Sequence, residues 1–416
     1  MGAQDAAEDD VAIIGGGVIG ACCAYYLALA GLSVTLFERD QIGGACSSRN
    51  AGLIVPSYSI PIATFATLRK ALRSLVLGGP FRIAGKLNLE LLRWCGLFAS
   101  ACRPKQVCRS TSILRDLTLA SAHLHSQLAQ SCDFGYETRG SVALFQTKHA
   151  LQAAERDAGI LQELGIPSRK FFAASLPGID PLISCRLAGA IEYPGDSQLI
   201  PSEFVSSVAS LAERLGAKIK TGVTIIQLAT SNGSPVLKSD RGAHRARMVV
   251  IAAGAWSGAL GNQLGVHLPL QAALGYGFSI DSSSFQPRFP LLLSEAKLAA
   301  TPMGGSVRFT GGFDLSDVGI PAGAKRAASI FKNIHRYFAK PLPAERKMWW
   351  SGLRPCTPDG LPVISRAPNH PLVVLATGHG MLGMTLGPLT GKLVSEIIVN
   401  DISDSHIPEL SARRFC

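Results

Sequence analysis

The stretch VAIIGGGVIGACCAYYLALAGLSVTLFE, residues 11–38, decides the fold of this chain. An apolar run leads into a glycine turn, a second apolar run of helical length follows, and a third ends in an acid. This order predicts a buried strand, a helix over 21–31 and a second buried strand over 33–38. The uncharged run 11–37 is also long enough for a membrane span, but four glycines among residues 11–20 favour the strand, turn and helix.

The glycines have the spacing GxGxxG directly after the first strand. Gly15 permits the tight turn, Gly17 lets the backbone approach a pyrophosphate, and Gly20 lets helix and strand pack closely. The N-terminus of the following helix offers free N–H groups and a positive dipole end to phosphates. Glu38 ends the second strand 18 residues after Gly20, where a carboxylate can accept both ribose hydroxyls. Together these features predict a Rossmann-type dinucleotide site.

Composition describes a globular chain that is long enough for two domains. Of its 416 residues, 47% are hydrophobic and 17% are charged. The ten cysteines include no CxxC pair and no Cys/His cluster at zinc spacing, so we expect no metal site and a reducing compartment. Residues 1–10 carry acids and no lysine or arginine, unlike a secretory signal, and we therefore expect a cytoplasmic protein.

Helix and strand patterns alternate at both ends of the chain and near residues 200–255. Between these parts, residues 64–130 have helical spacing, and residues 268–313 have short apolar runs that suit an antiparallel sheet. Further predicted elements are helices at 151–164 and 202–215, the second capped by Ser202, and strands at 141–146, 218–227 and 247–252. The predicted class is α/β: a Rossmann-type domain formed by 1–80, 198–262 and 345–416, with an inserted domain of antiparallel sheet plus helices formed by 81–197 and 263–344.

Three later segments place small residues where a cofactor could approach. Segment IAAGAW (251–256) ends an apolar strand in small side chains, which suits the crevice above a parallel sheet, although an ordinary strand end would look the same. Segments GLRPCTPDG (352–360) and ATGHGMLGM (376–384) follow, and the second opens a helix that runs to Val399. The N-terminus of this helix could stabilise negative charge on a reduced ring system. His379 is a candidate general base, but we favour a hydrogen-bonding role for a histidine in a glycine turn.

At these segments, and at SSRNAG (47–52), the chain resembles the D-amino acid oxidase-like superfamily of flavoproteins. Within it the FAD-dependent D-amino acid dehydrogenases are most similar, and glycine and sarcosine oxidases more loosely so. The resemblance covers nearly the whole chain and implies FAD as cofactor. The implied cofactor-binding residues are Gly15, Gly17, Val18, Ile19, Gly20, Glu38, Arg39, Ser47, Ser48, Arg49, Asn50, Ala51, Gly52, Val223, Ala253, Gly254, Trp256, Gly352, Arg354, Gly380, Met381, Leu382, Gly383 and Met384.

The resemblance also implies a substrate site. In the family an arginine on a central strand pairs with the substrate carboxylate, helped by a tyrosine on a neighbouring strand, and Arg308 and Tyr276 match those positions. A guanidinium suits this task because it binds a carboxylate through two hydrogen bonds. Arg354 is a candidate second anchor or a stabiliser of reduced flavin, and Tyr58 a candidate lid residue. The cysteine that holds flavin covalently in sarcosine oxidases would align with Gly352, so the FAD is expected to be non-covalent.

The implied activity is FAD-dependent oxidative deamination of D-amino or imino acids, by hydride transfer from the α-carbon to flavin N5. Alternatives on the same fold are a glycine or sarcosine-type amine oxidase, a 2-hydroxy acid dehydrogenase, and a flavoprotein that serves only as a scaffold subunit. The electron acceptor stays open between oxygen, a quinone and an electron-transfer protein.

A basic stretch suggests where a quinone-linked enzyme could meet a membrane. Residues 69–115 hold ten Lys/Arg and one acid, Glu90, without any nucleic-acid-binding motif, so nucleic acid is not expected as a partner. Residues 81–102 place Leu87, Leu91, Trp94 and Phe98 at helical spacing among basic residues. Such a helix could contact anionic lipid on the inner face of the membrane. We favour the alternative that its apolar face is buried in the protein and its basic face is solvated.

Overall fold

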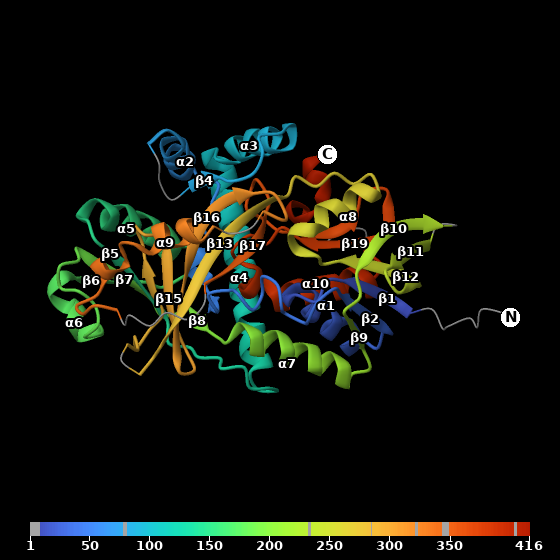
Figure 1. Cartoon of the computed structure of the whole chain (residues 1–416), viewed down its shortest axis with the longest axis horizontal. Coiled ribbons are helices and arrows are strands. Elements are labelled where there is room, and N and C mark those ends of the chain that lie inside the picture. Colours follow the sequence, from blue (N-terminus) through green and yellow to red (C-terminus); the bar gives the residue numbers. More distant parts are fainter. Residues whose placement is uncertain are drawn as a thin grey trace.

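The computed structural model describes residues 9–77, 81–231, 234–283, 285–320, 323–342, 349–402 and 406–416. Two large sheets lie side by side along the long axis of the molecule (Figure 1). The first sheet contains the N-terminal strand, and the second sheet forms the other half of the molecule.

The first sheet is built on parallel strands from three distant parts of the chain. Its order is β10 (Ile225–Ser231), β11 (Ser234–Ser239), β12 (Gly242–Ile251), β1 (Asp9–Ile14), β2 (Val34–Glu38) and β9 (Lys218–Thr221). Strand β19 (His370–Thr377) pairs in parallel with β12, and β18 (Val363–Ala367) is antiparallel to β19. Strands β1, β2, β9, β12 and β19 are parallel, so the turns that follow them meet at one edge, where a doubly wound sheet binds ligands.

Three helices pack together beside this sheet: α1 (Val18–Leu29), α7 (Pro201–Arg214) and α10 (Gly383–Val399). Helix α1 contains no charged residue, which suits a helix whose surface is almost wholly buried. A Cβ placed on Gly391 of α10 would lie 2.5 Å from the backbone of Cys22 in α1, so glycine permits this close helix packing. The predicted strand–turn–helix–strand over 11–38 is confirmed, with the helix starting three residues earlier than expected.

The second sheet is mainly antiparallel. Its order is β17 (Trp350–Cys356), β13 (Gln271–Asp281), β16 (Ser306–Ser316), β15 (Leu298–Met303), β14 (Leu291–Leu293), β5 (Ser141–Phe145), β7 (Gly189–Tyr193) and β6 (Arg169–Phe172), and β4 (Phe81–Ile83) pairs with β16. The antiparallel sheet expected over 268–313 is confirmed. The predicted domain boundaries remain a prediction, and two elements lie across them. Strand β17 pairs with β13 of the second sheet, and α4 (Pro104–Leu128) packs on α10 beside the first.

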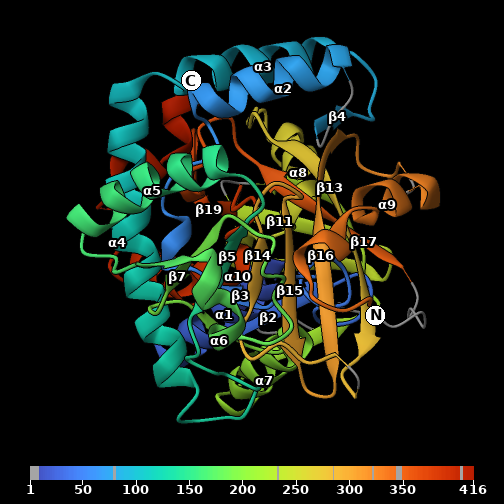
Figure 2. The same cartoon turned by 90° about the vertical axis from the view of Figure 1, so that its left-hand side faces the viewer.

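Helices α2 (Phe65–Leu77) and α3 (Leu89–Ala101) lie side by side above the sheets (Figure 2). Helix α5 (Lys148–Glu163) covers the outer strands of the second sheet, and α9 (Ala324–Phe331) lies beside β16. The remaining elements are short: β3 (Leu53–Ile54), β8 (Ser197–Gln198), α6 (Leu176–Ile179), α8 (Ser257–Gln263), and 3-10 turns at Pro56–Tyr58, Ala173–Ser175, Gly254–Trp256, Ile334–Tyr337, Pro408–Leu410 and Ala412–Phe415.

Three local expectations were wrong. Helix α7 starts at Pro201, whose missing N–H suits the first helical position, so Ser202 is not its cap. The strand expected over 218–227 is broken at Gly222, which has a φ of 64° and begins a turn toward β10. The helix expected over 81–102 begins only at Leu89.

The apolar side of α3 is buried, as favoured from the sequence. Trp94 and Phe98 pack against Ala63, Ala273 and Cys356, and the Trp94 indole N–H donates to the Cys356 carbonyl (3.0 Å). Leu91 is buried as well, whereas Leu87, expected on the same side, precedes the helix and is exposed. Among the described residues, no helix is long and apolar enough to cross a membrane. Within the same ranges, no group of three His, Cys, Asp or Glu residues is placed to hold a metal ion.

Candidate active site

A cavity of about 1880 Å³ extends from the edge of the first sheet to the face of the second. The turns after β1, β2, β12 and β19 line one part, and β13, β16, β17, α2 and α5 line the rest. Pockets for a single small ligand are usually about 300–1,000 Å³. The cavity therefore has room for a dinucleotide and a second small molecule.

The glycine turn has the geometry that the motif predicts. Gly15 has a φ of 109°, and a Cβ on it would lie 2.6 Å from the Ala252 carbonyl oxygen. A Cβ on Gly20 would lie 1.8 Å from the Gly15 carbonyl oxygen. Only glycine fits at these two positions. The Val18 N–H, at the start of α1, donates to the Ser47 hydroxyl (2.9 Å), so the loop over 43–50 crosses the helix N-terminus.

Glu38 is fixed by two backbone donors. The N–H groups of Gly16 (2.7 Å) and Asp40 (2.9 Å) donate to its two carboxylate oxygens. Because a carboxylate has about four acceptor positions, capacity remains for a ligand's hydroxyl groups. Beside it, the Arg39 guanidinium lies 4.0 Å from the centre of the Trp256 ring, and both side chains line the cavity.

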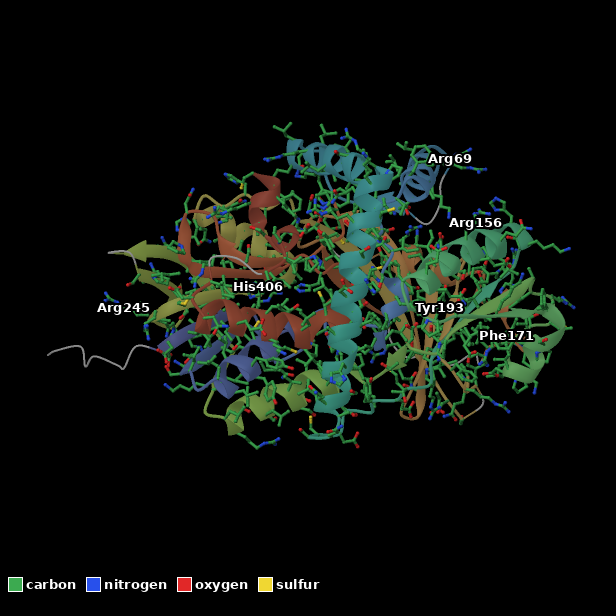
Figure 3. All side chains as sticks on the ribbon, turned by 180° about the vertical axis from the view of Figure 1, so that it is seen from behind. Arg69, Arg156, Phe171, Tyr193, Arg245 and His406 are labelled. Carbon is green, nitrogen blue, oxygen red and sulfur yellow. The ribbon has the colours of Figure 1, made fainter. Side chains whose placement is uncertain are left out.

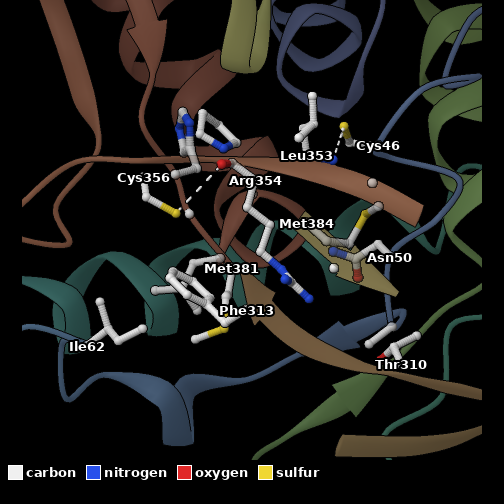
Figure 4. Close-up of a pocket in the computed structure, with 18 of the residues that line it drawn as sticks. Cys46, Asn50, Ile62, Thr310, Phe313, Leu353, Arg354, Cys356, Met381 and Met384 are labelled. Atoms are coloured by element: carbon white, nitrogen blue, oxygen red, sulfur yellow. Dashed lines mark hydrogen bonds between the residues drawn. The ribbon is translucent and has the colours of Figure 1, made fainter. Parts of the chain in front are cut away.

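Arg354 projects from β17 into the cavity among Phe313, Met381, Asn50 and Thr310 (Figure 4). Its Nη1 donates to the Gly312 carbonyl (2.8 Å), and burial lowers its pKa from the usual value for arginine. A Cβ on Gly275 of β13 would lie 2.5 Å from Nη1 and from Nη2, so glycine makes the space that the guanidinium occupies. The side chain is thus a partly buried cation with N–H groups left for a ligand.

Arg308 occupies a different place. Its Nη1 donates to the carbonyls of Ser48 (2.8 Å) and Asn50 (2.9 Å), and it is not among the residues that line the cavity. The guanidinium therefore holds the loop over 47–52 against β16. A second support comes from Arg49, whose Nη1 donates to the Ser351 carbonyl (2.9 Å).

Tyr276 also points away from the cavity. Its hydroxyl donates to the carboxylate of Asp314 (3.0 Å), which forms an ion pair with Arg326 (2.6 Å). Tyr276 is not a lining residue, whereas its neighbour Gly275 is. Among the predicted substrate residues, the structure brings Arg354 and Tyr58 to the cavity and not Arg308 or Tyr276.

The turn over residues 378–383, between β19 and α10, forms another wall of the cavity. The His379 Nε2 shares a hydrogen bond with the Thr390 hydroxyl (2.9 Å), and burial lowers the pKa of His379 to about 3. A neutral, internally bonded ring agrees with the hydrogen-bonding role favoured from the sequence. The Gly380 N–H donates to the Pro355 carbonyl (2.8 Å), and α10 starts at Gly383 with its N-terminus at the cavity.

Two cysteines lie near Gly352, the position that the resemblance to sarcosine oxidases aligns with their flavin-binding cysteine. Cys356 is buried, and burial raises the pKa of its thiol to about 12. Cys46, which the sequence reasoning missed, lines the cavity, and a Cβ on Gly352 would lie 3.7 Å from the Cys46 Cβ. The Cys46 sulfur accepts a hydrogen bond from the Leu353 N–H (3.1 Å, Figure 4).

A buried carboxylate supports the Tyr58 turn and was also missed. Asp196 is 1% exposed and accepts from the Ser57 N–H (3.1 Å), the Ser57 hydroxyl (2.6 Å) and the Ser141 hydroxyl (2.6 Å). Burial raises the pKa of Asp196 to about 6. It holds the 3-10 turn that carries Tyr58 to the cavity wall. No motif signals Asp196, because the three groups meet only in the fold.

Of the residues predicted to bind cofactor, most line this cavity. Gly20, Ser48 and Gly52 do not: the first packs α1 on β1, the second offers its carbonyl to Arg308, and the third closes a turn against Leu199 and Met303. The other predicted cofactor-binding residues are Gly15, Gly17, Val18, Ile19, Glu38, Arg39, Ser47, Arg49, Asn50, Ala51, Val223, Ala253, Gly254, Trp256, Gly352, Arg354, Gly380, Met381, Leu382, Gly383 and Met384, and all of them line it.

Comparison with known proteins agrees with this arrangement. The chain is similar to D-amino acid dehydrogenases of Allorhizobium ampelinum (30% identical over 416 residues, 97% of this chain and 98% of the relative) and Vibrio atlanticus (27% over 416 residues, 98% and 100%). Its fold matches glycine oxidase from Geobacillus kaustophilus (TM-score 0.75, 23% identity, 97% and 98% covered) and L-proline dehydrogenase from P. horikoshii (TM-score 0.76, 17% identity, 98% of each chain). The predicted fold class is confirmed. The family described as FAD dependent oxidoreductase (DAO) matches residues 10–397, and the chain therefore belongs to this family of FAD-dependent oxidoreductases.

Proposed function

We propose that this enzyme catalyses the oxidative deamination of D-amino or imino acids, with Arg354 holding the substrate carboxylate. The observation that carries the proposal is the Arg354 guanidinium, placed in the cavity by the space at Gly275 and held there by the Gly312 carbonyl. The full-length similarity to D-amino acid dehydrogenases supports an amino acid substrate.

The residues around the cavity fit FAD. The close approach at Gly15 and Gly17, the spare acceptor capacity of Glu38 and the helix start at Val18 suit a pyrophosphate and a ribose. When bound, FAD supplies the two-electron acceptor for the hydride of the substrate α-carbon. We propose that it is held without a covalent bond, because Gly352 replaces the attachment cysteine.

The protein's own contribution would be binding, orientation and exclusion of water. Arg354 would fix the carboxylate through two hydrogen bonds and so set the direction of the α-carbon. Phe313 and Met381 flank Arg354 with apolar surface (Figure 4) and would keep water away from that ion pair. His379 would take no proton, because burial keeps it neutral and Thr390 occupies its Nε2. The imino acid product then hydrolyses in water.

The carboxylate role is therefore proposed for Arg354 in place of Arg308. Arg308 would instead keep the loop over 47–52 in the shape that receives the cofactor. Tyr58 stays the candidate lid residue, since its turn is held by Asp196 at the cavity wall.

A substrate panel under anaerobic conditions tests the proposal. D-amino acids should bleach the yellow flavin absorbance, while L-amino acids, glycine, sarcosine and lactate should not. Bleaching by glycine or sarcosine alone would indicate an amine oxidase of that type, and bleaching by lactate a 2-hydroxy acid dehydrogenase. A flavin that none of these compounds reduces would favour the scaffold alternative.

We also propose that the electron acceptor is a membrane quinone, reached by docking on anionic lipid. Of the apolar residues predicted to face lipid, Leu91, Trp94 and Phe98 cannot serve because they are buried, but Leu87 is exposed. Four further apolar side chains on α2 and α3 are exposed as well: Phe65 (70% exposed), Leu72, Leu89 (81% exposed) and Leu92. Arg69, Lys86 and Arg93 lie among them in the sequence and do not line the cavity. Apolar side chains that enter the lipid and cations that attract its head groups together suit an anionic surface.

A further inference from the structure

The mouth of the cavity carries charged side chains that the proposed chemistry does not use. Lys70 and Arg73 of α2, Asp157 of α5 and Lys297 in the turn between β14 and β15 all line it. Each of the four is exposed. Within the described part of the chain, none of them forms an ion pair.

Lys297 is held in place by a rigid turn. Glu295 accepts hydrogen bonds from the N–H groups of Gln146 (2.9 Å) and Thr147 (3.0 Å), and the Tyr337 hydroxyl donates to its second oxygen (3.1 Å). These bonds fix the turn against the start of α5. Lys297 itself has a φ of 56°, in the left-handed region that strains a side chain such as lysine. Residues kept in strained conformations cluster at functional sites.

The same turn packs against the segment of β16 that holds Arg354. A Cβ on Gly311 would lie 2.6 Å from the Lys297 carbonyl oxygen, so the Lys297 backbone lies against Gly311. The next residue, Gly312, accepts the hydrogen bond from Arg354. Consecutive Cα atoms are about 3.8 Å apart. The Lys297 backbone and the Arg354 guanidinium therefore lie beside neighbouring residues of β16, and both residues line the same cavity.

The charges at this mouth favour an anion. Three cations face two carboxylates, and Glu295 already accepts hydrogen bonds on both of its oxygens. Lys297 and Asp157 reach solvent, yet both are crowded enough by the cavity wall for desolvation to lower the pKa of Lys297 and raise the pKa of Asp157. The neighbouring charge of Lys70 also lowers the pKa of Lys297, and Asp157 lies near both lysines. An anion placed between the two lysines would relieve their repulsion.

We propose that Lys297 and Lys70 form a subsite for a second anionic group of the substrate, the side-chain carboxylate of an acidic D-amino acid. This inference rests on the proposed function, in which Arg354 holds the α-carboxylate. The subsite selects dicarboxylic amino acids over isosteric amides, because the amide offers no charge to the lysines.

The test compares kcat/KM of the FAD-loaded enzyme for D-glutamate and D-glutamine. D-glutamate should be preferred by about tenfold or more, as expected for one charge-assisted hydrogen bond. Lys297→Gln and Lys70→Gln should each lower this ratio, chiefly by reducing kcat/KM for D-glutamate, because each removes a positive charge from the subsite. Arg69→Gln is the matched control, because Arg69 neighbours Lys70, lies on the outer surface (Figure 3) and does not line the cavity.

A binding measurement separates this inference from the proposed function. By calorimetry, glutarate should bind more tightly than glutaramate, its half-amide, and Lys297→Gln should remove the difference. Equal binding of the two compounds, or a D-glutamate to D-glutamine ratio near one in the unaltered enzyme, would overturn the subsite while oxidation of neutral D-amino acids upheld the proposed function. If no D-amino acid were oxidised, the proposed function would fail, and the calorimetry would still decide the subsite.

Discussion

Replacing Arg354 by lysine should sharply reduce the use of substrate while FAD remains bound. Lysine keeps the positive charge but loses the planar pair of donors, and it also loses the bond from Nη1 to the Gly312 carbonyl. Loss of one hydrogen bond to a charged group costs about 1.5–3 kcal/mol, or roughly 10- to 150-fold in kcat/KM. The assay is steady-state turnover of the best D-amino acid, with FAD content read from the absorbance spectrum.

Two further variants show whether this effect comes from the guanidinium position. Arg308→Lys should leave kcat/KM nearly unchanged at saturating FAD but weaken FAD retention, because it removes support from Ser48 and Asn50. Gly275→Ala should mimic Arg354→Lys without changing any charge, since its Cβ would enter the space of the guanidinium. If Arg308→Lys impaired kcat/KM more than Arg354→Lys did, the assignment of the carboxylate to Arg354 would be refuted.

Three other outcomes follow from the structure. Acid precipitation should release intact FAD into the supernatant; flavin that stays with the polypeptide would contradict non-covalent binding, and its loss in Cys46→Ser would identify the linked thiol. Burial raises the pKa of Asp196 to about 6 in the folded protein, so folding favours its protonated form. The resulting contribution to the free energy of unfolding is therefore full below about pH 4 and is lost as the pH rises through about 6. Denaturant unfolding should therefore show the stability of the natural protein falling by about 2–3 kcal/mol relative to Asp196→Asn between pH 4 and pH 7, and parallel pH curves would disprove the assignment. The protein should co-sediment with anionic vesicles at low salt, and Leu89→Ser with Leu92→Ser should weaken this; equal failure with anionic and neutral vesicles would exclude docking on lipid.

The cofactor side of the site could be predicted because its determinants are local in sequence. Gly15, Gly20 and Glu38 follow from the spacing of one strand–turn–helix–strand unit, and the structure places each where the spacing requires. The apolar spacing likewise predicted the burial of Leu91, Trp94 and Phe98 in α3, although not the exposure of Leu87 before the helix. Local spacing suffices where the contacting residues are neighbours along the chain.

The contacts of Arg308 and Tyr276 could not be predicted because they depend on strand register and on loops far apart in sequence. Arg308 and Thr310 lie two residues apart and so share one face of β16. The loop over 47–52 covers this face at Arg308, whereas at Thr310 the face is open to the cavity. Tyr276 follows Gly275 and so points to the opposite face, toward Asp314. Lys297 is signalled by no motif, because only the turn between two strands brings it to the cavity.

Contacts between β17 and the turn at His379 and Gly380 connect the two sheets and restrict their separation. Pro355 and Cys356 belong to the second sheet, yet Gly380 donates to Pro355, and Cys356 forms a bridge with His379 beside the first sheet. Trp94 adds a bond from α3 to the same strand. A hinge motion that parted the two halves would break the Gly380–Pro355 hydrogen bond and the Cys356–His379 bridge. Tyr58 and residues of α2 line the cavity wall, and we expect the exchange rate of substrate to respond to substitutions there more than to substitutions between the halves.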